Sequence, residues 1–386
     1  MSMQRSTERI LTTHCGSLAR PTDLLDLMKA EVRGEPYDHD TYNRRVRSAV
    51  AETVRQQVES GIDIPTDGEQ GKPGFFAYVS ERLTGFEPRP GASVTFFAAE
   101  VAAFPEYYKQ YFSQAMLGGS VAPIVPLVCT GPVSYRGQEA LRRAIDNLKT
   151  ALEGLKPEAV FMPAVAPSGV GMNEYYRTEE EYLHAVAEAM HTEYQAIVDA
   201  GFLVQVDDPF LTDVYSDASL NAVEKRKRAE MYVEALNHGL RGIPAEKVRF
   251  HTCYGINEGP RVHDAALKDI VDVMLKVQAG AYSFEAANAR HEHEYHVWEN
   301  VKLPAGKVLI PGVVTHASNI VEHPELIAER LTRYARLVGR ENVIAGTDCG
   351  FSSQATYNPE VHPTVVWAKF QAMAEGARLA TGQLWR

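Results

Sequence analysis

The sequence contains no long apolar run. None of its apolar stretches approaches the roughly 20 residues that a helix needs to cross a bilayer. Its first residues, MSMQRSTER, are polar and lack the apolar core of a signal peptide. Cysteine is also scarce, with four in 386 residues, which argues against a disulfide scaffold. We therefore expect a cytoplasmic protein with reduced thiols and no association with a membrane.

The sequence also has fewer positively charged residues than negatively charged ones. The 39 Lys and Arg residues are outnumbered by 50 Asp and Glu residues, which gives a net charge of -11. A broad nucleic-acid face is excluded, because phosphate binding needs clustered Lys and Arg. The one dense basic run, Lys225–Arg228, is interpreted as a solvated helix face, with a site for an anionic substrate tail as the alternative. The expected partners are small molecules rather than nucleic acid.

Short apolar runs alternate with longer amphipathic segments along the chain. The predicted strands are Ile10–Thr13, Ile62–Thr66, Ile124–Cys129, Ala159–Pro163, Phe202–Asp207, Val248–Cys253, Ala281–Glu285, Val308–Val314 and Val343–Asp348. The clearest predicted helices are Tyr42–Ser60, Thr178–Ala200, Glu322–Leu337 and Pro363–Ala380. Repeated strand-helix units predict an α/β fold with a parallel sheet, and about eight units predict a (β/α)8 TIM barrel.

Nine strands compete for the eight places in that barrel, so one is misassigned or lies outside it. An open doubly wound sheet is the alternative, but no G-x-G-x-x-G motif follows the first strand, which disfavours a dinucleotide-binding version. The stretch 85–119 interrupts the alternation and is rich in aromatic residues. It is interpreted as a lid, a subunit contact or an extra helix on the barrel wall. Without repeats or linkers, residues 1–386 are expected to form a single domain with this insertion.

Four side chains with metal-binding atoms fall at the ends of three predicted strands. His251 and Cys253 end one strand, Glu285 ends another, and Cys349 follows Asp348 at the end of the last. Strand ends meet at the catalytic face of a barrel, and residues two apart in a strand point the same way. Two thiolates, an imidazole and a carboxylate form a ligand set for zinc. The His-rich stretch 291–296 is a competing metal candidate, interpreted mainly as surface or supporting structure.

The formal charge of such a site indicates its chemistry. Zinc contributes two positive charges, while two thiolates and a carboxylate contribute three negative ones, leaving about -1. This charge makes the site poor at generating hydroxide, but well suited to binding a thiol as a reactive thiolate. The pattern favours alkyl transfer to sulfur over hydrolysis. A structural zinc is the alternative, although such sites usually show C-x2-C pairs, and none is present.

These residues resemble the cobalamin-independent methionine synthase family, specifically its catalytic C-terminal barrel. His251, Cys253, Glu285 and Cys349 match the order of the zinc ligands in that family. The resemblance further implies residues that bind homocysteine, an acid facing the folate, and a histidine that donates a proton. They are Gly16 and Ser17 for the carboxylate, Glu69 and Asp207 for the amino group, Asp213 for the folate side, and His316 as catalytic proton donor.

The sequence departs from the family on the side of the methyl donor. A Trp that the family has after a Gly-Pro-Val loop is not visible where this chain continues Ser134-Tyr135-Arg136. The family's classical members also have two barrels, and this chain has room for one. The donor therefore stays open between methyl-folate and other alkyl compounds, and the oligomeric state stays open, with a homo-oligomer as one option. The alternatives are an epoxyalkane:coenzyme M transferase and a non-catalytic zinc-binding scaffold or sensor.

Overall fold

The centre of the molecule is a curled, seven-stranded parallel sheet in the order β1-β10-β9-β8-β7-β6-β4. It is seen in a computed structural model, which describes residues 3–90, 97–116, 118–122, 125–255 and 258–385. The strands are β1 Leu11–Thr12, β4 Phe161–Val165, β6 Leu203–Asp207, β7 Val248–His251, β8 Ala281–Phe284, β9 Val308–Val314 and β10 Ile344–Thr347. Their residues are buried almost throughout, as expected for parallel strands covered on both faces.

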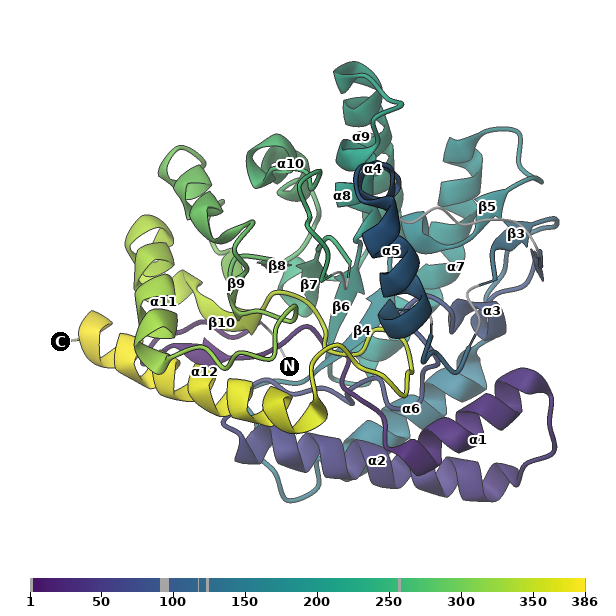
Figure 1. Cartoon of the computed structure of the whole chain (residues 1–386), viewed down its shortest axis with the longest axis horizontal. Helices are drawn as coiled ribbons and strands as arrows, with labels where there is room; N and C mark the ends of the chain where they lie inside the picture. The colour runs from purple at the N-terminus through teal and green to yellow at the C-terminus, as the bar shows by residue number, and fades with distance from the viewer. Residues whose placement is uncertain (1–2, 91–96, 117, 123–124, 256–257, 386) are drawn as a thin grey trace.

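Helices surround this sheet (Figure 1). They are α1 Thr22–Arg33, α2 His39–Glu59, α3 Val79–Arg82, α4 Ala98–Ala103, α5 Pro105–Tyr111, α6 Gln138–Ala151, α7 Glu179–Asp199, α8 Phe210–Ser216, α9 Ala222–Gly239, α10 Leu267–Met274, α11 Pro324–Val338 and α12 Pro363–Leu384. The four helices predicted from the sequence correspond to α2, α7, α11 and α12. Among the described residues, no helix is long and apolar enough to span a membrane.

Seven of the nine predicted strands correspond to strands of the main sheet, and one of the other two belongs to a separate sheet. The segment predicted as Ile124–Cys129 forms β3 Leu127–Cys129, while Ile124 itself lies outside the described residues. β3 pairs antiparallel with β2 Phe86–Pro88 and parallel with β5 Met172–Asn173 in a separate three-stranded sheet. The apolar pattern of a short strand does not reveal its partner, which explains the excess strand in the prediction.

The predicted strand Ile62–Thr66 lies between β1 and β4 but is only weakly paired. Ile64 forms a single parallel bridge with Thr13. On the other side, the Phe161 N–H donates to the Pro65 carbonyl at 3.2 Å, and the Glu158 N–H donates to the Asp63 carbonyl at 3.0 Å. These contacts place the segment at the gap between the two edges of the seven-stranded sheet.

The aromatic insertion lies near the carboxyl ends of the strands. Its described part contains β2, α4 and α5, and Figure 1 shows α4 and α5 in dark blue in front of the central sheet. The Glu100 carboxylate accepts a hydrogen bond from the His263 N–H at 2.6 Å, and the Tyr111 hydroxyl donates to the Glu360 carboxylate. The insertion is thus tied to loops that follow β7 and β10. Residues 91–96, including the aromatic Phe96, lie outside the described residues.

Candidate active site

Three of the four predicted metal ligands meet at the carboxyl ends of β7 and β10. Potential ligand atoms of His251, Cys253 and Cys349 all lie within 4.8 Å of one another, and the three residues are buried. The Sγ atoms of Cys253 and Cys349 are 3.2 Å apart, and both cysteines are free. His251 ends β7 and Cys253 follows two residues later, so the strand's two-residue repeat directs both side chains to one point.

The fourth predicted ligand, Glu285, lies outside this three-residue group. Its carboxylate accepts hydrogen bonds from Arg261 at 2.7 Å, from the Asn288 amide at 2.8 Å and from the Tyr254 N–H at 3.0 Å. Glu285 instead shares a second buried group with His316 and Asp348. In the structure, therefore, the Glu285 carboxylate is held by hydrogen-bond donors of the protein.

His251 has one ring nitrogen oriented by the protein and one without a partner. Its Nδ1 lies 3.2 Å from the Ser283 Oγ and 3.6 Å from the Cys15 Sγ. Its Nε2 is buried and has no hydrogen-bond partner. Burial, reinforced by the charge of Arg249, lowers the pKa of His251 to about 3. The ring is therefore neutral near pH 7, which is the state that binds a metal ion.

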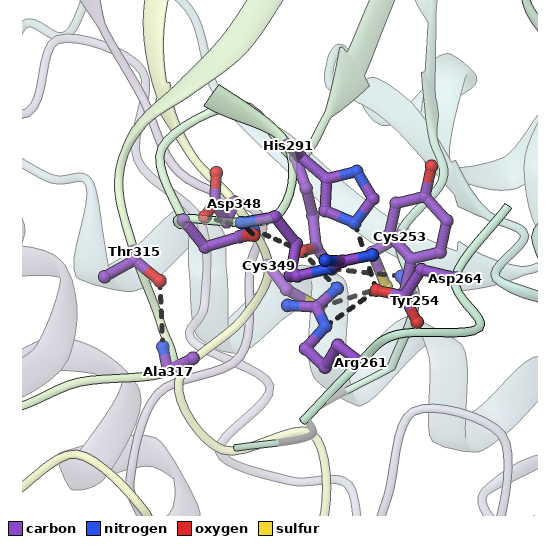
Figure 2. A network of polar contacts seen from close by, with 12 residues as sticks. Cys253, Tyr254, Arg261, Asp264, His291, Thr315, Ala317, Asp348 and Cys349 are labelled. Atoms are coloured by element: carbon purple, nitrogen blue, oxygen red, sulfur yellow. Dashed lines mark hydrogen bonds and ion pairs between the residues drawn. The ribbon is translucent and has the colours of Figure 1, made fainter. Parts of the chain in front are cut away.

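A buried ionic network supports the loop that carries Glu285. Arg261 donates to Asp264 at 2.8 Å as well as to Glu285, and His291 bonds the same Asp264 oxygen at 3.0 Å. The His291 ring stacks on the Tyr254 ring, with centroids 4.1 Å apart, beside this shared carboxylate (Figure 2). Arg261 has a φ of 56°, a strained conformation for a residue other than glycine. His291, at the buried end of the His-rich stretch, is thus held in place by contacts within the protein.

The cysteine-histidine group opens into a cavity that is continuous with solvent. Many of its lining side chains are aromatic, including Phe75, Phe76, Phe97, Tyr254 and Phe351. Phe97 belongs to the insertion. The insertion therefore contributes to the wall of the cavity that the metal-ligand group faces.

The residues predicted to bind an amino acid also surround this cavity. Ser17, Glu69 and Asp207 line it. Glu69 is 2% exposed, has a φ of 56°, and its Oε2 has no hydrogen-bond partner, although Lys72 Nζ lies 3.9 Å away. Asp207 accepts a hydrogen bond from the Gln205 amide at 2.8 Å. Burial raises the pKa of both carboxyl groups above the usual range.

The backbone amide of Gly16, predicted to bind the substrate carboxylate, already has an acceptor within the protein. Its N–H donates to the His14 Nδ1 at 3.2 Å, which leaves the Ser17 N–H as the amide without an acceptor among the described residues. Gly16 has a φ of 125°, and a Cβ there would lie 2.8 Å from the Pro163 side chain. A glycine is therefore required for the turn that presents Ser17 to the cavity.

Two further acids, Asp213 and Glu360, line the cavity. Asp213 lies on α8, and the structure shows no hydrogen-bond or ion-pair partner for its carboxylate among the described residues. The side chain retains exposed surface because it faces the cavity, while the surrounding protein raises its pKa to about 7 through desolvation. Glu360 accepts a hydrogen bond from Tyr111, and burial raises its pKa to about 7. The sequence pattern gave no indication of Glu360.

His316 lies behind the cavity rather than in its described wall. Neither of its ring nitrogens has a hydrogen-bond partner, and burial is the main cause that lowers its pKa to about 4. Sequence reasoning also missed Ser283, Arg261 and Cys15, which contact the predicted ligands. The contact of Ser283 could have been predicted from the sequence. Ser283 precedes Glu285 by two residues in the same predicted strand, so both side chains point to the same face.

Comparison with known proteins gives the family. The family model for the catalytic domain of cobalamin-independent synthase matches residues 167–369. Methionine synthases from Sulfolobus acidocaldarius and Thermococcus kodakarensis are 25% and 24% identical, each over 88% of this chain and 85% and 86% of their own lengths.

Two solved structures share the fold. The B12-independent methionine synthase of Shewanella sp. W3-18-1, in complex with selenomethionine, gives a TM-score of 0.71 at 18% identity, covering 98% of this chain and 99% of that one. A putative B12-independent methionine synthase from Listeria monocytogenes gives 0.67 at 17% identity, covering 96% and 98%. These structures share the fold, and the matched family model, which covers more than half of the sequence, assigns the family: the chain belongs to the cobalamin-independent synthase family of methyltransferases.

Proposed function

We propose that the chain transfers a methyl group to the thiol of homocysteine and uses zinc to do so. The observation that carries this proposal is the meeting of His251, Cys253 and Cys349 at one end of an open cavity. Glu69 and Asp207 line the same cavity and suit an amino-acid substrate. The relatives from Sulfolobus and Thermococcus are named methionine synthases, which supports the same reaction.

The residues present fit a zinc ion. Two neighbouring free thiols and a buried imidazole nitrogen without a partner form a soft donor set of the kind zinc prefers. Glu285 is the proposed fourth ligand, and binding would require it to exchange its contacts with Arg261 and Asn288. When bound, zinc lowers the pKa of a coordinated thiol, so that its sulfur can attack carbon as a thiolate near pH 7.

Homocysteine fits the chain's own polar groups. Its ammonium group can bind Glu69 and Asp207 through charge-assisted hydrogen bonds, and its positive charge would oppose the rise in pKa that burial causes in both carboxyl groups. Its carboxylate can accept from the Ser17 N–H. This arrangement leaves the thiol free to reach the cysteine-histidine end of the cavity.

We further propose that the sheet closes as a (β/α)8 barrel within a single domain. The bridge between Thr13 and Ile64, and the hydrogen bond from Phe161 to Pro65, support closure by the segment 62–66. In this proposal the insertion 85–119 is a lid, because Phe97 lines the cavity and Tyr111 binds Glu360 beside it.

As the family resemblance implies, His316 is the proposed residue that donates a proton to the leaving group of the methyl donor. Both ring nitrogens are free of protein partners, which supports a role in proton transfer. Asp213 stays the proposed contact of the donor. The alternative substrate coenzyme M carries a sulfonate, and the cavity wall offers it carboxylates rather than Lys or Arg among the described residues. The open cavity likewise argues against a purely structural metal site.

Replacing one ligand cysteine tests the proposal. Cys349→Ala should lose bound zinc and methionine formation together, while retaining the far-ultraviolet circular dichroism of the parent. Cys129→Ala is the matched control, because Cys129 is a buried free cysteine in the separate small sheet and lies outside the described cavity wall. Retention of full activity in Cys349→Ala, measured as methionine formed from homocysteine, would refute the function.

A further inference from the structure

Aromatic side chains form part of the cavity wall. Phe75 stacks on Phe210 with ring centroids 6.4 Å apart, and Phe76 packs edge-on against Phe75 at 5.0 Å. All three rings line the cavity. Phe210 and Asp213 are three residues apart on α8, so they project from the same face of that helix. An aromatic surface and an unpaired carboxylate therefore adjoin on one element.

Glu360 adds a second carboxylate to the cavity wall. One of its oxygens accepts from Tyr111, while Oε2 is buried and has no hydrogen-bond partner. A buried acceptor without a donor is unfavourable unless a ligand supplies the missing partner. Asp213 has no partner in the described residues either. The cavity wall thus presents carboxylate oxygens whose interactions are incomplete.

Basic side chains are missing from the same wall. Among the described residues that line the cavity, none is Lys or Arg. The internal residues outside the described ranges contain no Lys or Arg either. Nearby cations are already engaged: Lys72 donates to the Pro163 carbonyl at 2.7 Å, and Arg261 binds Asp264 and Glu285. An anionic donor would meet carboxylates here without a counter-charge.

We propose that the methyl donor is a small methyl sulfonium cation rather than an anionic folate. This inference rests on the proposed function, because it names the second substrate of the same site. Cations bind over aromatic faces, and carboxylates favour them by charge, so both features of the wall select a donor with positive charge next to its methyl groups. A quaternary ammonium ion shares this recognition chemistry but has a much poorer leaving group.

The reaction then balances without a proton donor. The homocysteine thiol loses its proton to water through the open cavity, and the resulting sulfur anion attacks a methyl carbon of the sulfonium. A new carbon–sulfur bond forms, the donor's carbon–sulfur bond breaks, and its electron pair returns to the donor sulfur. One anion and one cation become two neutral thioethers. The leaving sulfur needs no proton, so the proton donation proposed for His316 applies only to methyl donors whose leaving group must be protonated.

A donor comparison tests this inference with the zinc-loaded enzyme and homocysteine. The donors are trimethylsulfonium, S-methylmethionine, tetramethylammonium and 5-methyltetrahydrofolate, with methionine formation as the readout. We expect turnover with at least one sulfonium salt at a kcat/KM above that of the folate, and none with tetramethylammonium. A higher kcat/KM for the folate, or no turnover with either sulfonium salt, overturns the inference.

Variants separate recognition of the donor from recognition of the thiol. Asp213→Asn and Glu360→Gln should each raise KM for the sulfonium at least about tenfold, while KM for homocysteine and zinc content stay unchanged. Glu180→Gln, an exposed acid on α7, is the matched control and should leave both KM values unchanged. Equal KM values for the sulfonium in all three variants contradict the proposed binding wall.

The enzyme with cobalt in place of zinc distinguishes failure of the proposed function from failure of the sulfonium inference. Homocysteine should strengthen the sulfur-to-cobalt charge-transfer absorption whatever the donor is. No spectral change with homocysteine overturns the proposed function. A change with homocysteine, together with methylation only from the folate, keeps that function and overturns the sulfonium inference alone.

Discussion

At the scale of single residues, Ser283 sets the orientation of His251. Its hydroxyl lies 3.2 Å from Nδ1, leaving Nε2 without a protein partner. Groups that orient a metal-binding histidine typically contribute 10–100-fold to metal affinity. We therefore expect Ser283→Ala to weaken zinc binding by about 10–100-fold, measured by competition with a chromophoric chelator.

Ser60→Ala is the control for this prediction, because Ser60 is a buried serine at the end of α2. It should bind zinc with the affinity of the parent. Equal affinities of Ser283→Ala and the parent would show that packing alone orients the ring.

The sequence predicted the residues of the site better than their contacts. His251 and Cys253 could be paired in advance because a strand repeats every two residues, and Cys349 because parallel strands end at one face. The ion pair between Arg261 and Glu285 could not be predicted, because Arg261 lies in an irregular loop and has a strained backbone conformation. The proximity of Cys15 to His251 depends on side chains from separate strands, which no local pattern encodes.

At the scale of elements, His291 joins the loop after β7 to the 3-10 helix Glu292–Glu299. Burial disfavours its charged form, but hydrogen bonds with Asp264 and Glu294 raise the pKa of His291 to about 9. The unfolded value is near 6.5, so the folded state binds the proton more tightly. This stabilisation is complete below pH 6.5 and is lost as pH rises toward 9. The shift corresponds to at most about 3 kcal/mol.

Urea unfolding of the parent and of His291→Gln at several pH values checks this prediction. The difference in the free energy of unfolding should be largest near pH 6 and should shrink by pH 9.5. Other titrating groups cancel in the difference as long as they are common to both proteins. A difference that stays constant, or that grows with pH, would contradict a charged His291 in the folded protein.

Element positions followed from the sequence more reliably than strand partners did. Helices such as α7 and α12 begin and end close to their predicted bounds, because their amphipathic patterns are long. The segment predicted as Ile124–Cys129 has a strand's local pattern, but its neighbours in space are β2 and β5. Pairing of short strands depends on tertiary contacts, so the pattern could not assign β3 to its small sheet.

At the scale of the whole molecule, Arg249 links strands that lie far apart in the sheet order. Its side chain starts on β7, donates to the Thr13 hydroxyl at 3.0 Å and to the His14 carbonyl at 3.0 Å, and packs 3.7 Å from the Phe161 ring centroid. β7 is separated from β1 by three intervening strands. A side chain can bridge them only if the sheet curls so that these strands face one another, and this curvature is what brings the ligand-bearing strand ends together.

Removing that bridge should therefore weaken the fold as a whole. Arg249 is fully buried, and truncation of a large buried side chain typically costs about 3–5 kcal/mol. We expect Arg249→Ala to lower the free energy of unfolding in urea by that amount. Arg249→Met fills much of the volume without the hydrogen bonds, so its loss should be smaller. If Arg249→Ala unfolds like the parent, the interior contact contributes little, and the curl of the sheet must be maintained by the outer helices.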